Sequence, residues 1–76
     1  MKLCDAVIGR RVKVVKISGD LFCVKRIRAV GIAENDVLKV EKRRFGVIVS
    51  LNGRLLAMDD LYSRCIEVDY EDSRNG

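Results

Sequence analysis

The chain of 76 residues contains no histidine, no proline and no tryptophan, and aromatic residues make up only 5% of it. Without histidine, it lacks a side chain that transition-metal sites usually recruit. With so few aromatic residues, the core must consist mainly of Val, Ile and Leu, which favours strands because β-branched side chains fit the pleat of a sheet. So short a chain forms one domain with a small core, and this favours a binding or regulatory module over an enzyme.

Long apolar runs are also missing. No stretch approaches the roughly 18 consecutive apolar residues that a membrane-spanning helix needs. Asp5 and Gly9 interrupt the short apolar start of the chain, so it does not resemble a secretion signal. We therefore expect a cytoplasmic protein that does not insert into the membrane.

Cysteines are few and scattered. Cys4, Cys23 and Cys65 are widely spaced and form no C-x-x-C pair. Their odd number argues against a disulfide scaffold, and the absence of clustered Cys or His argues against a zinc site. We expect no metal site and no cofactor, and we expect Cys23 and Cys65 to be small core residues.

Catalytic motifs are missing as well. The chain has no G-x-x-x-x-G-K phosphate loop and no pairing of Ser with a histidine base. The neighbouring acids Asp59 and Asp60 are better explained by the start of a helical turn, where one caps the turn and the other faces the helix dipole. We expect no catalytic residues and no enzymatic activity.

Positive charge is in excess. The net charge is +4, and it resides in residues 1–68, because residues 69–76 are mainly acidic. A basic body suits a nucleic acid, an acidic protein partner or the anionic surface of a membrane, and it also serves solubility alone.

The apolar pattern predicts five short strands and one helix. Strands are expected over residues 10–18, 37–43, 47–51, 54–58 and 65–68, and the helix over 21–30. The alternation in the first strand shifts at Val15, which suits a β-bulge. The lead-in before Gly9 is expected to place Leu3, Val7 or Ile8 on the core.

The helix carries clear start and stop signals. Asp20 can cap its first turn, and Gly31 can adopt the left-handed conformation that ends many helices, with Ile32 folding back as the apolar contact. The residues expected on its buried face are Leu21, Cys23, Val24, Ile27 and Val30.

The turns are marked by residues that tolerate a positive φ. Asn35 is expected at a positive φ, and Asn52-Gly53 predicts a hairpin with a type I′ turn. Asp59 is expected to cap a single helical turn over residues 60–64.

Together these elements predict a mainly β fold. It is a small SH3-like barrel of five strands, with one short helix after the first strand and one helical turn before the last. Residues 1–68 would form the barrel domain, and residues 69–76 would form a polar, flexible tail.

The order and spacing of these elements resemble a known family. The matching features are Leu3 and Gly9, Arg26-Ile27, Val30-Gly31-Ile32, Asn52-Gly53, Leu56-Ala57 and Ile66-Glu67-Val68. They resemble the ferrous iron transport protein A (FeoA) family, whose members are small SH3-like domains. The chain departs from the family at Glu34-Asn35, where a Gly is usual, and at Ser63, where an Ala is usual.

This resemblance implies a function. FeoA proteins are cytoplasmic accessories of the membrane ferrous iron transporter FeoB, which has a GTP-binding domain on its cytosolic side. The resemblance therefore implies a protein that binds this cytosolic region and supports ferrous iron uptake, and we expect it not to carry iron itself. Related domains also occur at the C-terminal end of metal-dependent repressors. The alternative is a small basic barrel that binds nucleic acid or a peptide.

A partner surface is expected where basic and apolar side chains gather. The expected partner-binding residues are Phe22, Lys25, Arg26, Arg43, Arg44, Phe45 and Leu55. Basic residues beside an exposed aromatic ring could also bind single-stranded nucleic acid. The simpler interpretation of residues 43–46 is a solvated turn with Phe45 folded over the mouth of the barrel.

Overall fold

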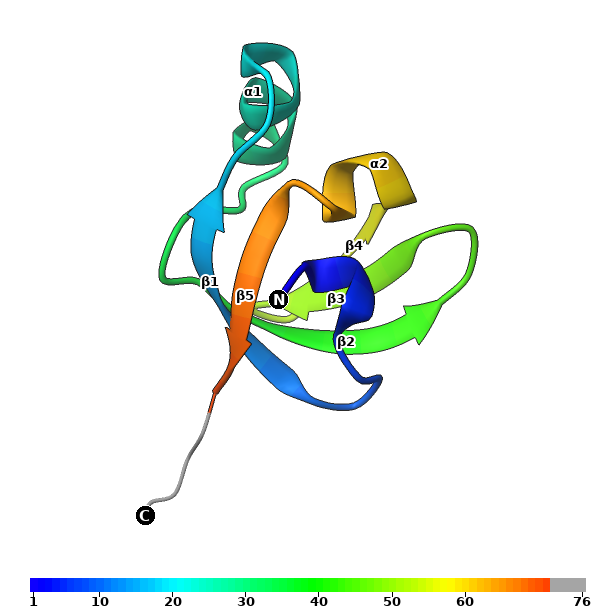
Figure 1. Cartoon of the computed structure of the whole chain (residues 1–76). Helices are drawn as coiled ribbons and strands as arrows, with labels where there is room; N and C mark the ends of the chain where they lie inside the picture. Colours follow the sequence, from blue (N-terminus) through cyan, green and yellow to red (C-terminus); the bar gives the residue numbers. More distant parts are fainter. Residues whose placement is uncertain (72–76) are drawn as a thin grey trace.

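The computed structural model describes residues 1–71 and confirms the mainly β, SH3-like fold (Figure 1). Five antiparallel strands lie in the order β4-β3-β2-β1-β5. They are β1 (Arg11–Ile17), β2 (Val37–Arg43), β3 (Val47–Leu51), β4 (Arg54–Met58) and β5 (Ile66–Tyr70). The helical elements are η1 (Leu3–Asp5), α1 (Leu21–Ala29) and α2 (Asp60–Ser63).

Two bulges coil the sheet. The pairing of β1 with β5 shifts between Val14 and Lys16, which confirms the bulge expected at Val15. A second shift in the pairing of β2 with β3, between Val40 and Lys42, was not predicted. Because each bulge adds one residue to a strand, the side chains that follow it point to the opposite face of the sheet from the one that simple alternation predicts. After the second bulge, Arg43 is therefore paired with the buried Val47.

The core is aliphatic and is supplied by every strand. Its strand residues are Val12, Val14, Ile17, Leu38, Val40, Val47, Val49, Leu51, Met58, Ile66 and Val68. From the N-terminal segment, Leu3 and Ala6 are fully buried, whereas Val7 and Ile8 are exposed. Of the three residues considered for the lead-in, Leu3 is the one that reaches the core.

Helix α1 begins and ends as predicted. The Cys23 N–H donates to the Asp20 carboxylate at 2.9 Å, and Gly31 has φ +103°. At the other end, the Gly31 N–H donates to the Arg28 carbonyl and the Ile32 N–H to the Ile27 carbonyl. These two bonds form a Schellman motif, closed by the buried pair Ile27 and Ile32.

The expected buried face of α1 is wrong in part. Cys23 and Ile27 are buried and Val24 is half-buried against the core, but Leu21 is 69% and Val30 42% exposed. Figure 1 shows the reason, because α1 stands at one end of the sheet instead of lying across its face. A helix in this position buries a narrower stripe than its apolar pattern predicts.

The predicted turns are present. Asn35 has φ 75°, and Asn52 and Gly53 have φ 52° and 83°, as a type I′ hairpin turn requires. Asp59 precedes α2, and its carbonyl accepts the N–H groups of Tyr62 and Ser63. The expected side-chain cap is wrong, because the Asp59 carboxylate makes no capping hydrogen bond within the described part of the chain.

The last strand extends beyond its predicted end at residue 68. Strand β5 continues to Tyr70, whose hydroxyl accepts the Val7 N–H at 3.0 Å and whose ring lies 4.0 Å from the Arg10 guanidinium carbon. Asp69 and Tyr70 also pair with Lys13 and Val12 of β1, so the last strand ends two residues later than predicted. The rest of the predicted tail, residues 72–76, lies outside the described residues.

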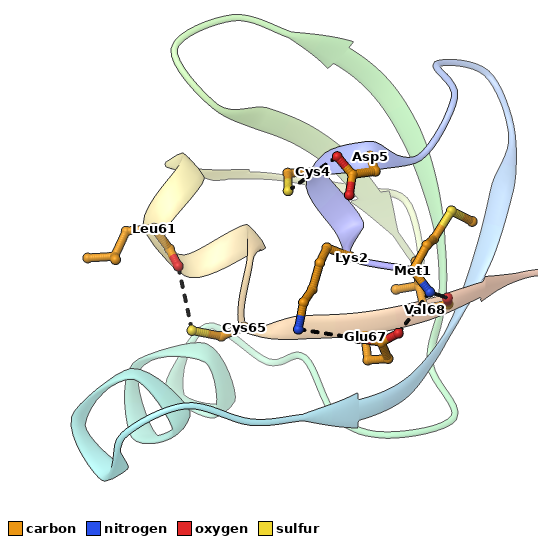
Figure 2. Close-up of polar contacts among 8 residues, drawn as sticks. All are labelled: Met1, Lys2, Cys4, Asp5, Leu61, Cys65, Glu67 and Val68. Carbon is orange, nitrogen blue, oxygen red and sulfur yellow. Dashed lines mark hydrogen bonds and ion pairs between the residues drawn. The ribbon is translucent and has the colours of Figure 1, made fainter.

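The N-terminus is bound to the same strand (Figure 2). The Met1 ammonium group lies 2.8 Å from a carboxylate oxygen of Glu67, and the ammonium group of Lys2 lies 3.4 Å from the other oxygen. The Met1 ammonium also donates to the Val68 carbonyl at 3.1 Å. These contacts place η1 beside β5.

Candidate functional site

A groove lies between α1, the β2–β3 turn, β4 and α2. We call it the Phe45 groove, and its volume is about 280 Å³. Its lining residues are Arg26, Ile27, Val30, Arg44, Phe45, Val47, Ile48, Ala57, Met58, Asp59 and Tyr62. The set combines an apolar interior with two arginines, one carboxylate and two aromatic rings. This composition is typical of a surface that receives an apolar side chain with acidic neighbours.

The β2–β3 turn is shaped by Gly46. Its φ is +125°, and a Cβ built on it would lie 2.2 Å from the Met58 carbonyl oxygen and 2.7 Å from the Asp59 Cα. Only glycine therefore lets this turn pack directly against the backbone where β4 leads into α2. This close approach brings the turn to the edge of the groove.

Phe45 projects from that turn. Its φ is 55°, in the left-handed region that bulky residues rarely adopt. The ring is 94% exposed, so the expectation that Phe45 folds over the mouth of the barrel is wrong. An exposed ring held on a strained turn at the rim of a groove is the kind of feature that marks binding sites.

Arg26 links the two helices across the groove. Its guanidinium carbon lies 5.9 Å from the centre of the Tyr62 ring, within the range of a cation–π contact. Tyr62 is half-buried against the core, so this contact places a positive charge over a fixed aromatic surface. Arg44 adds a second positive charge, and Asp59 supplies the negative one.

The structure brings three of the seven predicted residues into the Phe45 groove: Arg26, Arg44 and Phe45. Phe22 lies one helical turn before Arg26, and Val30 lies one turn after it, so the three share one face of α1. Phe22 is 65% exposed and extends this stripe beyond the groove. Lys25 is exposed on the same helix, outside the groove lining.

Leu55 lies at the other end of the surface. Leu55 of β4 pairs with Ser50 of β3. The next pair on the same face is Ala57 with Ile48, and both of these residues line the groove. Since alternate residues of a strand share a face, Leu55 continues the apolar surface of Ile48 and Ala57. It is 68% exposed, so this face of β4 is open to solvent at Leu55.

Arg43 has a different role. Its guanidinium group donates to the carbonyl oxygens of Cys4 and Ala6. The bulge in β2 turns this side chain toward η1, away from the Phe45 groove. Arg43 therefore binds the N-terminal segment to the barrel, whereas the sequence predicts it beside Arg44 on the partner surface.

The groove also contains Tyr62, Asp59 and Val30, which the sequence does not predict as site residues. Tyr62 was assigned only to a helical turn, and no local pattern connects it with Arg26 on a distant helix. Val30 was assigned to the buried face of α1. The adjacent Asp59 and Asp60 were recognised, but only as part of a helix start.

The ionisable groups with shifted pKa values lie outside the groove. Burial, with the charge of Asp20 and the neighbouring Cys65, raises the pKa of the Cys23 thiol to about 11. Hydrogen bonds from its own backbone and from Arg28 lower the pKa of Glu34. Within residues 1–71, no group of three or more Cys, Asp or Glu side chains is placed to hold a metal ion.

A model of the FeoA domain matches residues 1–70. The chain belongs to the FeoA domain family. No curated protein sequence matches the chain closely enough to count as a relative. In the part of this FeoA-domain chain that the structure describes, no helix is long and apolar enough to cross a membrane.

Solved structures share this FeoA fold. The FeoA protein from Chlorobium tepidum is 25% identical with a TM-score of 0.84, over 100% of this chain and 75% of that one. FeoA from Stenotrophomonas maltophilia complexed with zinc, described as an SH3 domain protein and a candidate ferrous iron transport activating factor, is 17% identical (TM-score 0.73, 91% of this chain and 89% of that one). A manganese-dependent transcriptional repressor in complex with manganese is 21% identical (TM-score 0.88), with 93% of this chain matching 36% of the repressor.

Proposed function

We propose that this FeoA-domain chain is a non-enzymatic accessory protein of ferrous iron uptake. Membership of the FeoA family supports a role in ferrous iron transport. The absence of histidine from the chain and the small size of the domain agree with a protein that acts by binding other proteins.

The proposed partner is the cytosolic GTP-binding region of a FeoB-type transporter, and the proposed contact surface is the Phe45 groove with Phe22 and Leu55 at its two ends. The observation that carries this proposal is the Phe45 ring, 94% exposed beside an apolar groove. Aromatic and arginine side chains dominate the binding energy of many interfaces. Arg26 and Arg44 would pair with acidic residues of the partner and orient it.

The alternative function is binding of single-stranded nucleic acid, and one observation favours it. Phe45 is exposed next to Arg44, and an aromatic ring beside a positive charge can stack a base while the charge contacts phosphate. Asp59 in the same groove opposes this function, because its negative charge would repel the phosphate groups of a nucleic acid.

The test is an NMR titration of the isotope-labelled full chain with the isolated cytosolic GTP-binding region, at physiological salt. We expect shift changes confined to the groove residues, and about tenfold weaker binding for Phe45→Ala, the loss of a typical interface anchor. The matched control is Val15→Ala, an exposed apolar residue on the β1 bulge that does not line the groove.

The outcomes separate the two functions. Equal affinity of Phe45→Ala and the parent chain would contradict the proposed surface. A flat titration combined with binding to a single-stranded oligonucleotide that weakens steeply with salt would replace the transporter by nucleic acid.

A further inference from the structure

Two cysteines from distant parts of the chain lie beside the loop that joins β1 to α1. Cys23 is in the first turn of α1 and is buried, and Cys65 is half-buried between α2 and β5. The Ser18 N–H of the loop donates to the Cys65 carbonyl at 2.8 Å, which holds the two segments together. Neither cysteine has a part in the proposed partner surface.

Gly19 in this loop lies close to both cysteine side chains. A Cβ built on Gly19 would lie 2.9 Å from the Cys65 sulfur, 3.6 Å from the Cys65 Cβ and 3.8 Å from the Cys23 Cβ. Both cysteine side chains therefore approach the same point beside Gly19. A disulfide needs its two Cβ atoms about 4 Å apart, so bond formation would bring the loop and the first turn of α1 to that separation.

The two thiols differ in their surroundings. The Cys65 sulfur lies 3.5 Å from the Leu61 carbonyl oxygen, and Figure 2 shows it beside the end of α2. Cys65 is half-buried, whereas Cys23 is buried. Burial is the main cause that raises the pKa of Cys23, and the proximity of Cys65 is another.

We propose that Cys23 and Cys65 form a redox-active thiol pair, which hydrogen peroxide converts into a disulfide that ties α1 to the junction between α2 and β5. This role was not expected from the sequence, which predicts that both are small core residues. It goes beyond the proposed transport function and does not depend on it.

The chemistry proceeds in two steps. The Cys65 thiolate attacks one oxygen of hydrogen peroxide, the O–O bond breaks, and the products are Cys65 sulfenic acid and hydroxide, which takes up a proton to become water. The Cys23 sulfur then attacks the Cys65 sulfur, the S–S bond forms, the S–O bond breaks, and the second oxygen leaves as water with the proton of Cys23. In sum, two thiols are oxidised, and one peroxide is reduced to two molecules of water.

The disulfide would change how α1 is held. In the reduced protein the helix is anchored mainly by the burial of Cys23 and Ile27. The new bond would fix its first turn to Cys65, which follows α2 in the chain. Since α1 carries Arg26 and α2 carries Tyr62, oxidation would restrict the movement of the two walls of the Phe45 groove relative to each other.

In the test, the reduced full chain is treated with hydrogen peroxide and the remaining free thiols are blocked. Mass spectrometry then counts the blocked thiols and maps the cross-linked peptides. We expect the free thiols to fall from the three of the reduced chain to one. The mass should fall by two hydrogen atoms, with one cross-linked peptide pair that contains Cys23 and Cys65. Cys4→Ser is the matched control, because the Cys4 thiol faces Asp5 on η1, and it should form the same disulfide.

Single variants complete the test. Cys23→Ser should form no disulfide within the chain and should accumulate a Cys65 sulfenic acid that dimedone traps, and Cys65→Ser should leave Cys23 as a thiol. Should Cys23→Ser fail to fold, the Cys65→Ser variant and the peptide map of the parent chain still decide. A disulfide that involves Cys4, a disulfide only between two chains, or oxidation of Cys65 to sulfinic acid with Cys23 still free would overturn the proposal.

Discussion

The five-stranded sheet and the region formed by α1 and the β2–β3 turn are built differently. Along β1 and β3, alternate side chains are almost completely buried, whereas α1 exposes Leu21, Phe22 and Val30, and the turn exposes Phe45. The sheet therefore holds most of the apolar area that stabilises the domain. The apolar side chains of α1 and of the turn remain at the surface. Substitutions in the sheet should therefore change stability, and substitutions in α1 or the turn should change binding.

The largest expected effect joins the two regions. Gly46→Ala should lower the free energy of unfolding by about 4 kcal/mol, because the new Cβ combines a strained φ with a collision against backbone atoms of Met58 and Asp59. Gly53→Ala is the matched control, since its φ is also positive but no described heavy atom lies within 4 Å of the new Cβ. It should cost about 1 kcal/mol. Urea denaturation of both variants measures the difference, and equal losses would contradict the proposed packing.

A second pair of variants tests the comparison directly. Leu38→Ala, at a fully buried position of β2, should cost about 3 kcal/mol because it leaves a cavity in the sheet. Leu21→Ala, at a 69% exposed position of α1, should change the free energy of unfolding by less than about 0.5 kcal/mol. Comparable losses in urea denaturation would mean that α1 contributes to the core as much as the sheet does.

Two neighbouring arginines should separate structure from binding. Arg43→Ala should lower the free energy of unfolding by about 1.5 kcal/mol, because it removes the guanidinium group that donates to the carbonyl oxygens of Cys4 and Ala6. Arg44→Ala should leave the stability within about 0.5 kcal/mol of the parent but weaken binding of the transporter's cytosolic region. Thermal unfolding measures the stability, and the titration described above measures the binding. Unchanged stability with weaker binding for Arg43→Ala would contradict these roles.

The smallest effect concerns the acid side of the stability curve. The hydrogen bond from the Met1 ammonium, supported by Lys2, lowers the pKa of Glu67 below its ordinary value of 4.5. Because the folded-state pKa is lowered, this contribution to stability is complete above pH 4.5 and is lost as the pH falls through the lowered value.

Glu67→Gln should therefore make the loss of stability in acid less steep, as followed by urea denaturation at several pH values. Glu71→Gln is the control, because its contact with Arg11 is longer, at 3.6 Å. An unchanged slope for Glu67→Gln would show that the ammonium contact does not persist in solution.

Local features were predictable because the residue itself carries the physical reason. Asp20 accepts a first-turn N–H, Gly31 and Asn35 adopt a positive φ, and Asn52-Gly53 forms the hairpin turn, as their chemistry predicts. The predicted strands 37–43, 47–51 and 54–58 have the bounds that the structure shows. The end of β5 was missed because Tyr70 is held by contacts with Val7 and Arg10, which a local pattern does not contain.

The candidate site was predictable only in its composition. Exposed basic and apolar residues were expected at Arg26, Arg44 and Phe45, and the structure brings these three into one groove. The different role of Arg43 was not predictable, because it depends on the bulge in β2 and on the position of η1. Tyr62 and Asp59 join the groove only because β4 and α2 fold back against the β2–β3 turn.

The type and order of the elements, the turns and the SH3-like class follow from alternation, capping and backbone conformation over a few residues. Long-range packing sets which arginine binds η1 and which lines the groove, why residue 46 must be glycine, and that Cys23 and Cys65 both approach Gly19. These properties depend on distances between residues far apart in the chain. Those distances are set by how the sheet coils, and no local pattern of residues encodes them.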